Sequence, residues 1–499
     1  MIIFGATDEG NISSIQECLD TYASWSGQKI NYFKSNILFS KNVSQHTKSG
    51  LVAMMGLKIA PHNLKYLSLP LQIGRSKKEA FNGLVEKVMK KYQGWKVKTL
   101  SQAARTSLIR SVTSSISTYA MSSYLLPKCI SNQLDTLHWK FWWGYNDQNH
   151  GCYLKGWDSL CKPKANGGIG IRISIDFNKT LISKLTWDVA TNANKQWVIM
   201  FKNKYLRGQD FLLMQPPKQA SITCQSIFKC REVAQKGLCC RVGNGRNIQI
   251  WWDAWIPNEP NFKPRLRIGA EPKYQYVSDL ILHDSRQWDK GKLNEIFHQE
   301  TNKNILQIHL PIILKEDSFI WATNSAGSFS VKSAYLTDQK HRFDFFSPQT
   351  SNEWLALWNS KIHNRLKLLL WKLALEMLPV NEVLNHRFSI SERECFLCNE
   401  QLETLEHLFM ECPVVEQVWA LSPMPLLIHK FKGRPMSKWV KMMVKPEIVL
   451  GIHGEKAKEF TLLVALTCDI IWMEKNRIRI DGGHVDPMLI SSKVSRFFK

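Results

Sequence analysis

Four side chains in the last quarter of the chain have the types and the spacing of a metal site. The pattern is C-x2-C-x8-H-x4-C, and its members are Cys395, Cys398, His407 and Cys412. Thiolate and imidazole ligands of this number close a tetrahedral shell around Zn²⁺, which leaves no position for water or substrate. We therefore predict a structural zinc ion. A redox Cys-x-x-Cys pair and four unrelated residues are the alternatives.

The segments around these ligands should be helical. A helix from about Leu402 would present both His407 and Cys412, and a strongly helical block at 365–374 should stop before Pro379. Residues 376–419, hereafter the zinc unit, contain nine Glu but only two Arg. A zinc domain that grips phosphates should be basic, so we expect this zinc to organise the fold while other segments touch nucleic acid.

Composition points to a folded protein with a polyanionic partner. Hydrophobic residues make up 44% of the 499 residues and charged residues 22%, while the formal net charge is +24. Such an excess is typical of proteins that bind nucleic acid, with a membrane surface as the weaker alternative. No apolar run is long enough to span a bilayer, and the N-terminus lacks a signal-peptide pattern. We predict an intracellular protein, with nucleus or cytoplasm and the oligomeric state left open.

Two helices should carry much of the positive charge. Residues 79–93 have an amphipathic period that Gly94 would end, and Ser101 should cap a second helix that ends before Pro127. Between 75 and 110 there are only two acidic residues, Glu79 and Glu86. We predict phosphate-backbone contacts from the ten basic residues of this stretch, a solvated helix face being the alternative. They are Arg75, Lys77, Lys78, Lys87, Lys90, Lys91, Lys96, Lys98, Arg105 and Arg110.

The glycine, tryptophan and cysteine residues favour structural roles. The Gly-Gly-Ile-Gly stretch at 167–170 lacks the Lys-Ser/Thr ending of a phosphate-binding loop. The 19 Trp are expected mainly in the core, with base stacking as the alternative. The 12 Cys are too few for a disulfide scaffold and indicate a reducing compartment. Four of them have no ligand-like spacing, and their role is left open: Cys224, Cys230, Cys239 and Cys240.

Taken in chain order, these motifs resemble the C-terminal part of plant non-LTR (long interspersed) retrotransposon reverse transcriptases. The segment 26–31 with Lys34 resembles the one that follows the catalytic aspartates, where the resemblance implies that Lys34 assists nucleotide addition. Residues 66–71 resemble the primer grip, with Ser68 at a usual glycine. The similarity continues through the thumb and connection and ends in the reverse-transcriptase zinc-binding domain. Its further segments lie at 95–101, 141–144, 242–245, 251–255, 321–335 and 358–419.

The resemblance also implies what the chain should lack. The polymerase aspartate pair of the family precedes the segment with which this chain begins, and a ribonuclease H domain follows residues 472–477 in many relatives. Polymerases need carboxylates to hold their metal ions, and Asp147 and Asp253 are isolated in the sequence. We therefore expect no catalytic residues and no enzyme activity. The alternatives are the C-terminal portion of an active RNA-directed DNA polymerase and a domesticated protein-interaction factor.

The expected fold is α+β and α-rich, with five parts in chain order. We predict a truncated palm remnant at 1–60, a helical basic thumb-like region at 61–130 and a mixed, Trp- and Gly-rich connection at 131–350, which should be loosely organised at 261–350. A small zinc-organised domain at 351–420 and a basic helical tail at 421–499 would complete the chain. Short strands are expected at 1–4, 37–40 and 329–331.

Overall fold

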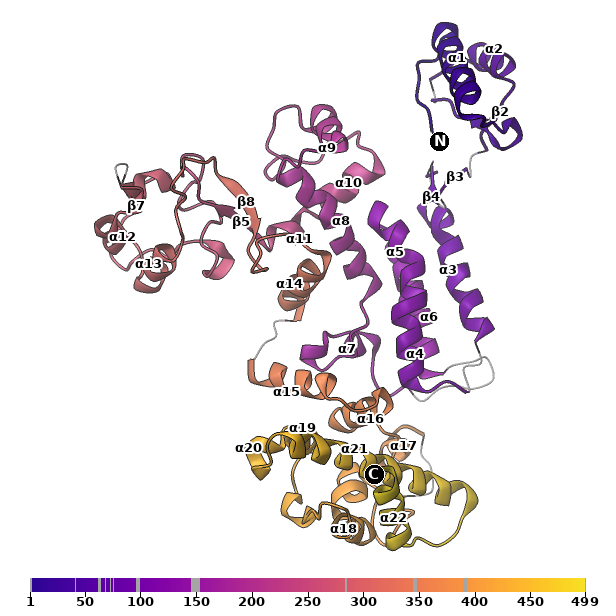
Figure 1. Ribbon diagram of the computed structural model, residues 1–499, viewed down its shortest axis with the longest axis vertical. Helices are drawn as coiled ribbons and strands as arrows, with labels where there is room; N and C mark the ends of the chain where they lie inside the picture. Colours follow the sequence, from indigo (N-terminus) through magenta and orange to yellow (C-terminus); the bar gives the residue numbers. More distant parts are fainter. Residues whose placement is uncertain are drawn as a thin grey trace. The chain divides into compact units, whose positions relative to one another are not determined.

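The computed structural model describes residues 2–40, 42–61, 64–67, 69–71, 73–74, 76–95, 99–144, 153–282, 285–343, 348–388 and 393–498. Helices dominate the described chain, and its strands form short two-stranded sheets, so the α-rich α+β class is confirmed (Figure 1). Two compact units divide at residues 83 and 84. No described helix has both the length and the apolar character needed to cross a membrane. The five predicted boundaries, the palm and the thumb stay predictions.

The first unit has a small core under two capped helices. Asp8 accepts a hydrogen bond from the Asn11 N–H at the start of α1, and Gly27, with φ of 70°, ends it. The expected strand at 1–4 is wrong for described residues 2–4, because no neighbouring strand pairs with them. The strand expected at 37–40 is present only at Ile37, because the observed strand covers Asn36 and Ile37, pairs with residues 58–59 and does not extend to 38–40. The elements are α1 (Glu9–Ser26), η1 (Tyr32–Lys34), β1 (Asn36–Ile37), α2 (Gln45–Met55), β2 (Lys58–Ile59), β3 (Lys65–Tyr66) and β4 (Leu69–Pro70).

Both predicted basic helices are present. The first is α3 (Lys77–Gly94), in which Val88 is fully buried and the Tyr92 hydroxyl lies 2.9 Å from Thr113 Oγ1 and 2.8 Å from His138 Nδ1. In the second, Ser101 accepts a hydrogen bond from Ala104 N–H. That helix contains a π turn and ends before Pro127 as expected, in three parts: α4 (Gln102–Leu108), η3 (Ile109–Thr113) and α5 (Ser114–Ser123).

A central helix, α8 (Ser174–Ala190), packs against α5, α6 (Lys128–Trp143) and α14 (Val331–Phe343) (Figure 1). Asn178 on α8 donates to the carbonyls of Met121 and Tyr124 and accepts from Leu126 N–H, so its side chain fixes the end of α5. The remaining elements of this region are α7 (Trp157–Leu160), η4 (Lys164–Asn166), α9 (Gln196–Phe201), η5 (Lys202–Leu206), α10 (Ile222–Lys229) and α11 (Arg231–Gln235).

Residues 238–321 have a core of their own, so the loose organisation expected at 261–350 is wrong for the part that belongs to this core. Trp255 and Ile250 are fully buried in it, and β5 pairs antiparallel with β8 at Leu238↔Trp321. The strand expected at 329–331 is also wrong, because Val331 begins α14. The elements are β5 (Leu238–Arg241), η6 (Pro260–Phe262), η7 (Val277–Leu280), β6 (Ile281–Leu282), β7 (Gln287–Trp288), α12 (Lys290–Ile296), α13 (Gln299–Leu306) and β8 (Ser318–Trp321).

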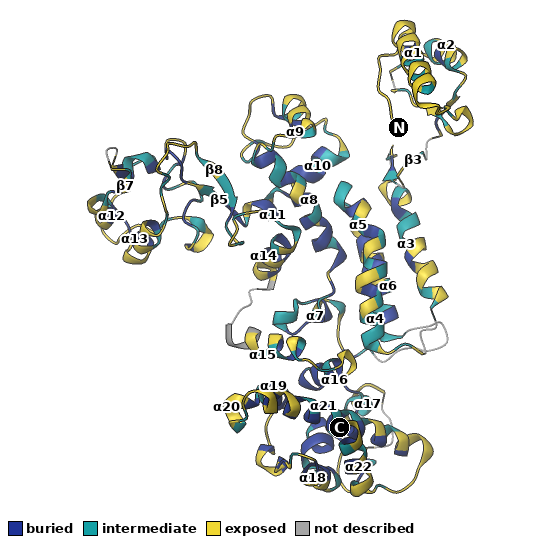
Figure 2. Cartoon of the chain, viewed as in Figure 1, coloured by how far each residue is buried: buried dark blue, intermediate teal, exposed yellow. Residues whose placement is uncertain are grey.

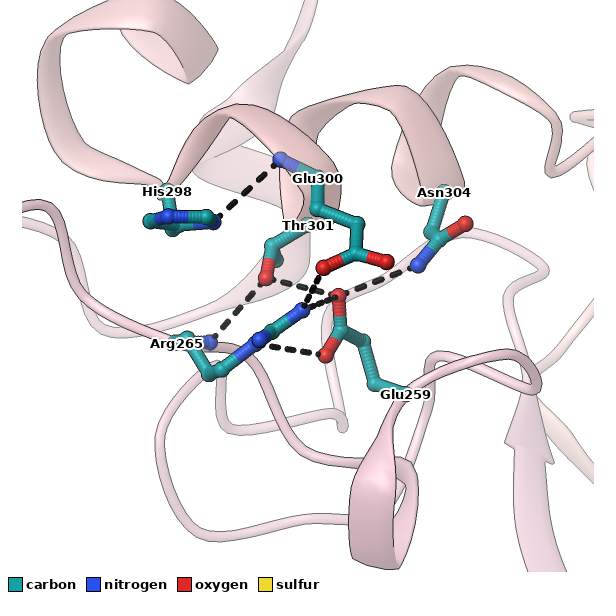
Figure 3. Close-up of polar contacts among 6 residues, drawn as sticks. All are labelled: Glu259, Arg265, His298, Glu300, Thr301 and Asn304. Carbon is teal, nitrogen blue, oxygen red and sulfur yellow. Dashed lines mark hydrogen bonds and ion pairs between the residues drawn. The ribbon is translucent and has the colours of Figure 1, made fainter.

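A buried carboxylate ties this lobe together. Glu259, whose side chain is fully buried, accepts hydrogen bonds from Arg265 Nε at 3.0 Å, Thr301 Oγ1 at 2.7 Å and Asn304 Nδ2 at 3.0 Å (Figure 3). These bonds stabilise the charged form, and the pKa of Glu259 is lowered against the opposing effect of burial. The carboxylate therefore links the 259–265 loop to α13 through these hydrogen bonds.

The C-terminal region is a helical assembly whose buried core also includes residues from earlier helices, such as Ile109, Phe141 and Trp142 (Figure 2). Trp371, Trp419 and Trp439 are fully buried there, as most Trp of the chain were predicted to be. The helices are α15 (Pro348–Asn359), α16 (Asn364–Ala374), α17 (Asn381–Phe388), η8 (His407–Glu411), α18 (Pro413–Ala420), η9 (Ile428–Phe431), α19 (Met436–Val444), α20 (Pro446–Leu450), α21 (Glu455–Asp481) and α22 (Pro487–Phe498).

Candidate metal centre and basic surface

The four predicted zinc ligands meet at one point. The candidate ligand atoms of Cys395, Cys398, His407 and Cys412 all lie within 4.8 Å of one another, and Cys398 Sγ is 3.3 Å from His407 Nε2. A tetrahedral shell with Zn–S bonds of about 2.3 Å requires ligand atoms about 3.8 Å apart. The cluster is thus close to the size that Zn²⁺ needs, and the residues fit a structural zinc ion.

A tight turn presents the first two sulfurs. Asn399 N–H donates to the Cys395 carbonyl at 2.8 Å, and Asn399 has φ of 56°, which Asn tolerates better than most residues. Cys395 N–H donates to the Gln401 carbonyl at 2.8 Å, beside an antiparallel bridge between Glu394 and Leu402. The chain therefore reverses within a few residues and aims both thiols inward.

A π turn presents the other two ligands. Residues 407–411 form η8, and the Cys412 N–H donates to the His407 carbonyl five residues earlier at 2.8 Å. The wider turn brings residues i and i+5 to the same side, which an α-helix would not do. Pro413 then begins α18, where its missing N–H costs nothing. The predicted helix is confirmed in outline, but its π geometry was not foreseen.

The electrostatics of the cluster favour a cation. Hydrogen bonds from Cys412, His407 and the Cys398 and Leu397 N–H groups lower the pKa of Cys395 to about 4 against the effect of burial. The pKa of Cys412 is raised by its hydrogen bond with Cys395, by burial and by the negative charge on that neighbour. A second thiolate in this buried space is stable when a metal ion supplies positive charge.

A buried ion pair, which sequence reasoning missed, fastens this turn to the last long helix. Lys475 Nζ on α21 lies 2.8 Å from Glu403 Oε1, and both side chains are fully buried. Glu403 Oε1 also accepts from Asn381 N–H at 3.0 Å, and Lys475 Nζ lies 5.0 Å from the Trp472 ring centroid. Lys475 lies in the 472–477 segment. A lysine inside an apolar helical stretch was the sequence signal that could have indicated a buried charge in need of a partner.

The predicted basic residues do not form a single surface. Lys77, Lys78, Lys87, Lys90 and Lys91 are exposed on α3, whereas Arg105 Nη1 donates to the Trp142 carbonyl at 3.2 Å near the end of α6. Burial lowers the pKa of the Arg105 guanidinium. Arg110 is exposed on η3. Three of the ten, together with Ser68, lie outside the described residues: Arg75, Lys96 and Lys98.

The glycine motifs serve close packing. Gly243 and Gly245 N–H groups donate to Asp317 Oδ1 at 2.7 and 2.9 Å, so this backbone cradle already holds a carboxylate of the chain itself. At Gly168 a Cβ would lie 1.7 Å from the Lys162 carbonyl oxygen, and the Gly167 carbonyl accepts from Trp371 Nε1 at 2.8 Å. Neither motif has the strand–loop–helix form of a phosphate-binding loop.

The unassigned cysteines are mostly core residues. Cys224, Cys230 and Cys239 are buried, and burial raises the pKa of Cys230 and Cys239 to about 12. Thiols of this kind are inert as ligands and nucleophiles. Within the described ranges, the metal-ligating group is the set of four residues in the zinc unit.

Comparison with known proteins agrees with this site. Residues 329–419 match the family described as zinc-binding in reverse transcriptase. Over 383 residues, or 74% of this chain, the sequence is 28% identical to an Arabidopsis thaliana protein named "Putative ribonuclease H protein", and the match covers 60% of that relative. An "Uncharacterized mitochondrial protein" of Arabidopsis thaliana is 26% identical over 147 residues, which is 29% of this chain and 96% of the relative. The chain spans less than two thirds of the length of the first relative. Together, these matches confirm the resemblance to a plant retroelement reverse transcriptase that the sequence indicated.

Proposed function

We propose that this C-terminal region of a plant retroelement reverse transcriptase, with its zinc-binding domain, holds nucleic acid and does not itself polymerise. The supporting observation is the distribution of charge. Lys87, Lys90 and Lys91 are exposed on α3, and none forms an ion pair with a described residue. With a net charge of +24, such lysines are free to replace the counterions of a phosphate backbone.

The zinc unit contributes architecture in this proposal. Its exposed residues include Glu382, Glu394 and Glu400, which would repel phosphates. Its ligands are thiolates and an imidazole in a closed set, whereas phosphoryl transfer uses carboxylate-held metal ions with open positions. The zinc ion supplies folding energy when bound, and the chain's other segments contact the nucleic acid.

The test is the salt dependence of binding by the full chain. The variant Lys87→Gln/Lys90→Gln/Lys91→Gln should lower the magnitude of the log K versus log salt slope by about 2 on single strands, since each lost phosphate contact removes about 0.7. The matched control Lys290→Gln/Lys303→Gln/Lys456→Gln also removes three exposed lysines, from other helices. Weak wild-type binding without a salt slope would contradict the proposal.

The second candidate is a portion of an active polymerase, because the match covers only 60% of the first relative. In that case Lys34, which is exposed at the end of η1, becomes the candidate for assisting nucleotide addition. A primer-extension assay distinguishes the two candidates when the polypeptide is also tested together with a polymerase region that carries the aspartate pair. We expect no incorporation by this polypeptide alone or with that region, and incorporation by the mixture that Lys34→Ala abolishes would favour the second candidate.

A further inference from the structure

A groove on the second unit lies between the helical stretch α4–η3–α5 and the segment 170–174, which is irregular up to residue 173 and then begins α8. Its volume is about 580 Å³, and it is open to solvent. Hydroxyl groups and two arginines provide most of its polar lining. Of these residues, the sequence predicted only Arg110 as a nucleic-acid contact. The lining residues include Ser107, Arg110, Ser111, Ser114, Ser115, Thr118 and Arg172.

The helical wall of the groove is small and polar. Its Ser and Thr recur every three or four residues, so they share one side of the helix over about three turns. The hydroxyls of Ser111 and Thr118 donate to the carbonyls four residues earlier, at 2.7 and 2.9 Å. Each hydroxyl has a single proton, so it donates to a ligand oxygen by rotating away from its helix carbonyl, and it can accept from a ligand hydroxyl without losing that bond. Short side chains also let a ligand approach the helix closely.

The opposite wall holds its arginine in place. The Arg172 guanidinium lies 4.4 Å from the Phe177 ring centroid. The flanking backbone is fixed, because Ile173 N–H donates to the Tyr335 hydroxyl at 3.3 Å and Ser174 N–H to Asp135 Oδ1 at 3.1 Å. A planar guanidinium held in this way loses little entropy on binding a phosphate.

Positive charge in the groove is not neutralised by the protein. Neither Arg110 nor Arg172 has a carboxylate within ion-pair distance among the residues that the structure describes. Burial and then the charge of Arg110 lower the pKa of Lys164, and burial lowers the pKa of Arg172 with a smaller contribution from Arg110. The nearby Asp176 is already paired with Arg342. An anion in the groove would relieve this mutual repulsion.

We propose that the hydroxyl groove, defined by the lining residues above, binds the sugar–phosphate backbone of a nucleic acid. Arg110 and Arg172 grip phosphate oxygens, and the Ser and Thr side chains donate to the same backbone. Arginine and hydroxyl side chains are the groups that make such positioning contacts. The length of the hydroxyl face suits a polymer better than a single phosphate ion. This inference rests on the proposed nucleic-acid binding. It adds the groove as a second binding surface, in addition to the exposed lysines of α3.

The experiment measures fluorescence anisotropy of labelled single-stranded RNA, single-stranded DNA and duplex DNA with the full chain across salt concentrations. Arg110→Gln/Arg172→Gln should weaken binding at least about tenfold and lower the slope by about 1.4 on single strands. The control Arg246→Gln/Arg496→Gln removes two exposed arginines elsewhere. Ser111→Trp, which fills the groove without changing charge, should weaken binding as well. Inorganic pyrophosphate as competitor reports whether a small phosphate suffices.

Each outcome bears on the inference. Groove variants that bind like the control overturn it, and if the α3 lysine variant still loses its salt slope, the proposed function survives alone. Absence of salt-dependent binding by the wild-type chain overturns both. If equimolar pyrophosphate displaces the oligonucleotide, and the groove variants keep the wild-type dependence of oligonucleotide binding on salt, the claim that the groove binds a polymer backbone is overturned. Near-ultraviolet circular dichroism of each variant confirms that a loss of binding is not a loss of fold.

Discussion

The zinc unit and the hydroxyl groove use polar side chains in opposite ways. In the zinc unit, four ligand atoms within 4.8 Å are turned inward, and a buried lysine is matched to a buried carboxylate. In the groove, two arginines face solvent without a carboxylate partner among the described residues. The first arrangement satisfies its charges internally and therefore builds structure. The second leaves charge for a partner, which is how a binding surface differs from a structural site.

The largest effect should come from opening the zinc shell. Cys412→Ser removes one ligand, and structural zinc contributes on the order of 10 kcal/mol to small domains. We expect loss of bound zinc and of the cooperative unfolding of the C-terminal helices, measured by elemental analysis and calorimetry. Cys129→Ser, an exposed thiol outside the zinc unit, is the control. A zinc-free variant with an unchanged transition would contradict the structural role.

Breaking the buried pair should cost the next largest amount. Lys475→Met leaves the buried carboxyl group of Glu403 without its partner, and such a loss costs about 3–5 kcal/mol. Urea unfolding should show this difference, whereas Lys456→Met, an exposed lysine of the same helix, should change stability little. The double variant Glu403→Gln/Lys475→Met should recover part of the loss. If it is as unstable as Lys475→Met alone, the pair is not the source of the effect.

The wall of the hydroxyl groove that carries Arg172 depends on close packing at Gly168. Gly168→Ala would place a Cβ 1.7 Å from the Lys162 carbonyl oxygen, so the wall that continues to Arg172 must shift. Overpacking costs about 1–3 kcal/mol, and we expect a lower melting temperature together with weaker nucleic-acid binding. Gly94→Ala, where nothing lies within 4 Å of the added atom, is the control. Unchanged stability and binding in Gly168→Ala would show that the wall adapts freely.

The smallest effect concerns pH. Burial lowers the pKa of His138, which lines the groove, to about 4, while the unfolded value is about 6.5. The unfolded chain therefore binds more protons between these values, so stability falls as pH drops through this window. Between about pH 7.5 and 5.5 the loss through His138 should be about 1 kcal/mol.

The difference between wild type and His138→Gln isolates this contribution. That comparison is needed because Asp135, with its pKa raised by burial to about 6, contributes the opposite slope between about pH 4 and 6. Gln keeps an acceptor for the Tyr92 hydroxyl, which lies 2.8 Å from His138 Nδ1. As pH drops from about 7.5 to 5.5, wild type should therefore lose about 1 kcal/mol of unfolding free energy relative to the variant. Parallel curves for the two proteins would contradict a buried neutral His138.

The features that could be predicted from the sequence are those set by residues close together in the chain. The Cys and His spacing identified the metal site because ligands within 18 residues must converge through short turns. Ser101 as an N-cap and the helix after it were predictable for the same reason. The strand expected at 329–331 failed because Val331 instead begins a helix that packs on α8. Propensity over three residues is weak beside such packing.

The sequence by itself determined the zinc ligands, the helical character and the excess of positive charge. These follow from residue type, spacing and composition, which need no knowledge of distant contacts. Tertiary structure alone decided the rest. It paired Glu403 with Lys475, turned Arg105 onto the Trp142 carbonyl and brought Arg172 opposite Arg110. Those partners are far apart in the chain, and their meeting depends on the packing of whole helices, which no local pattern encodes.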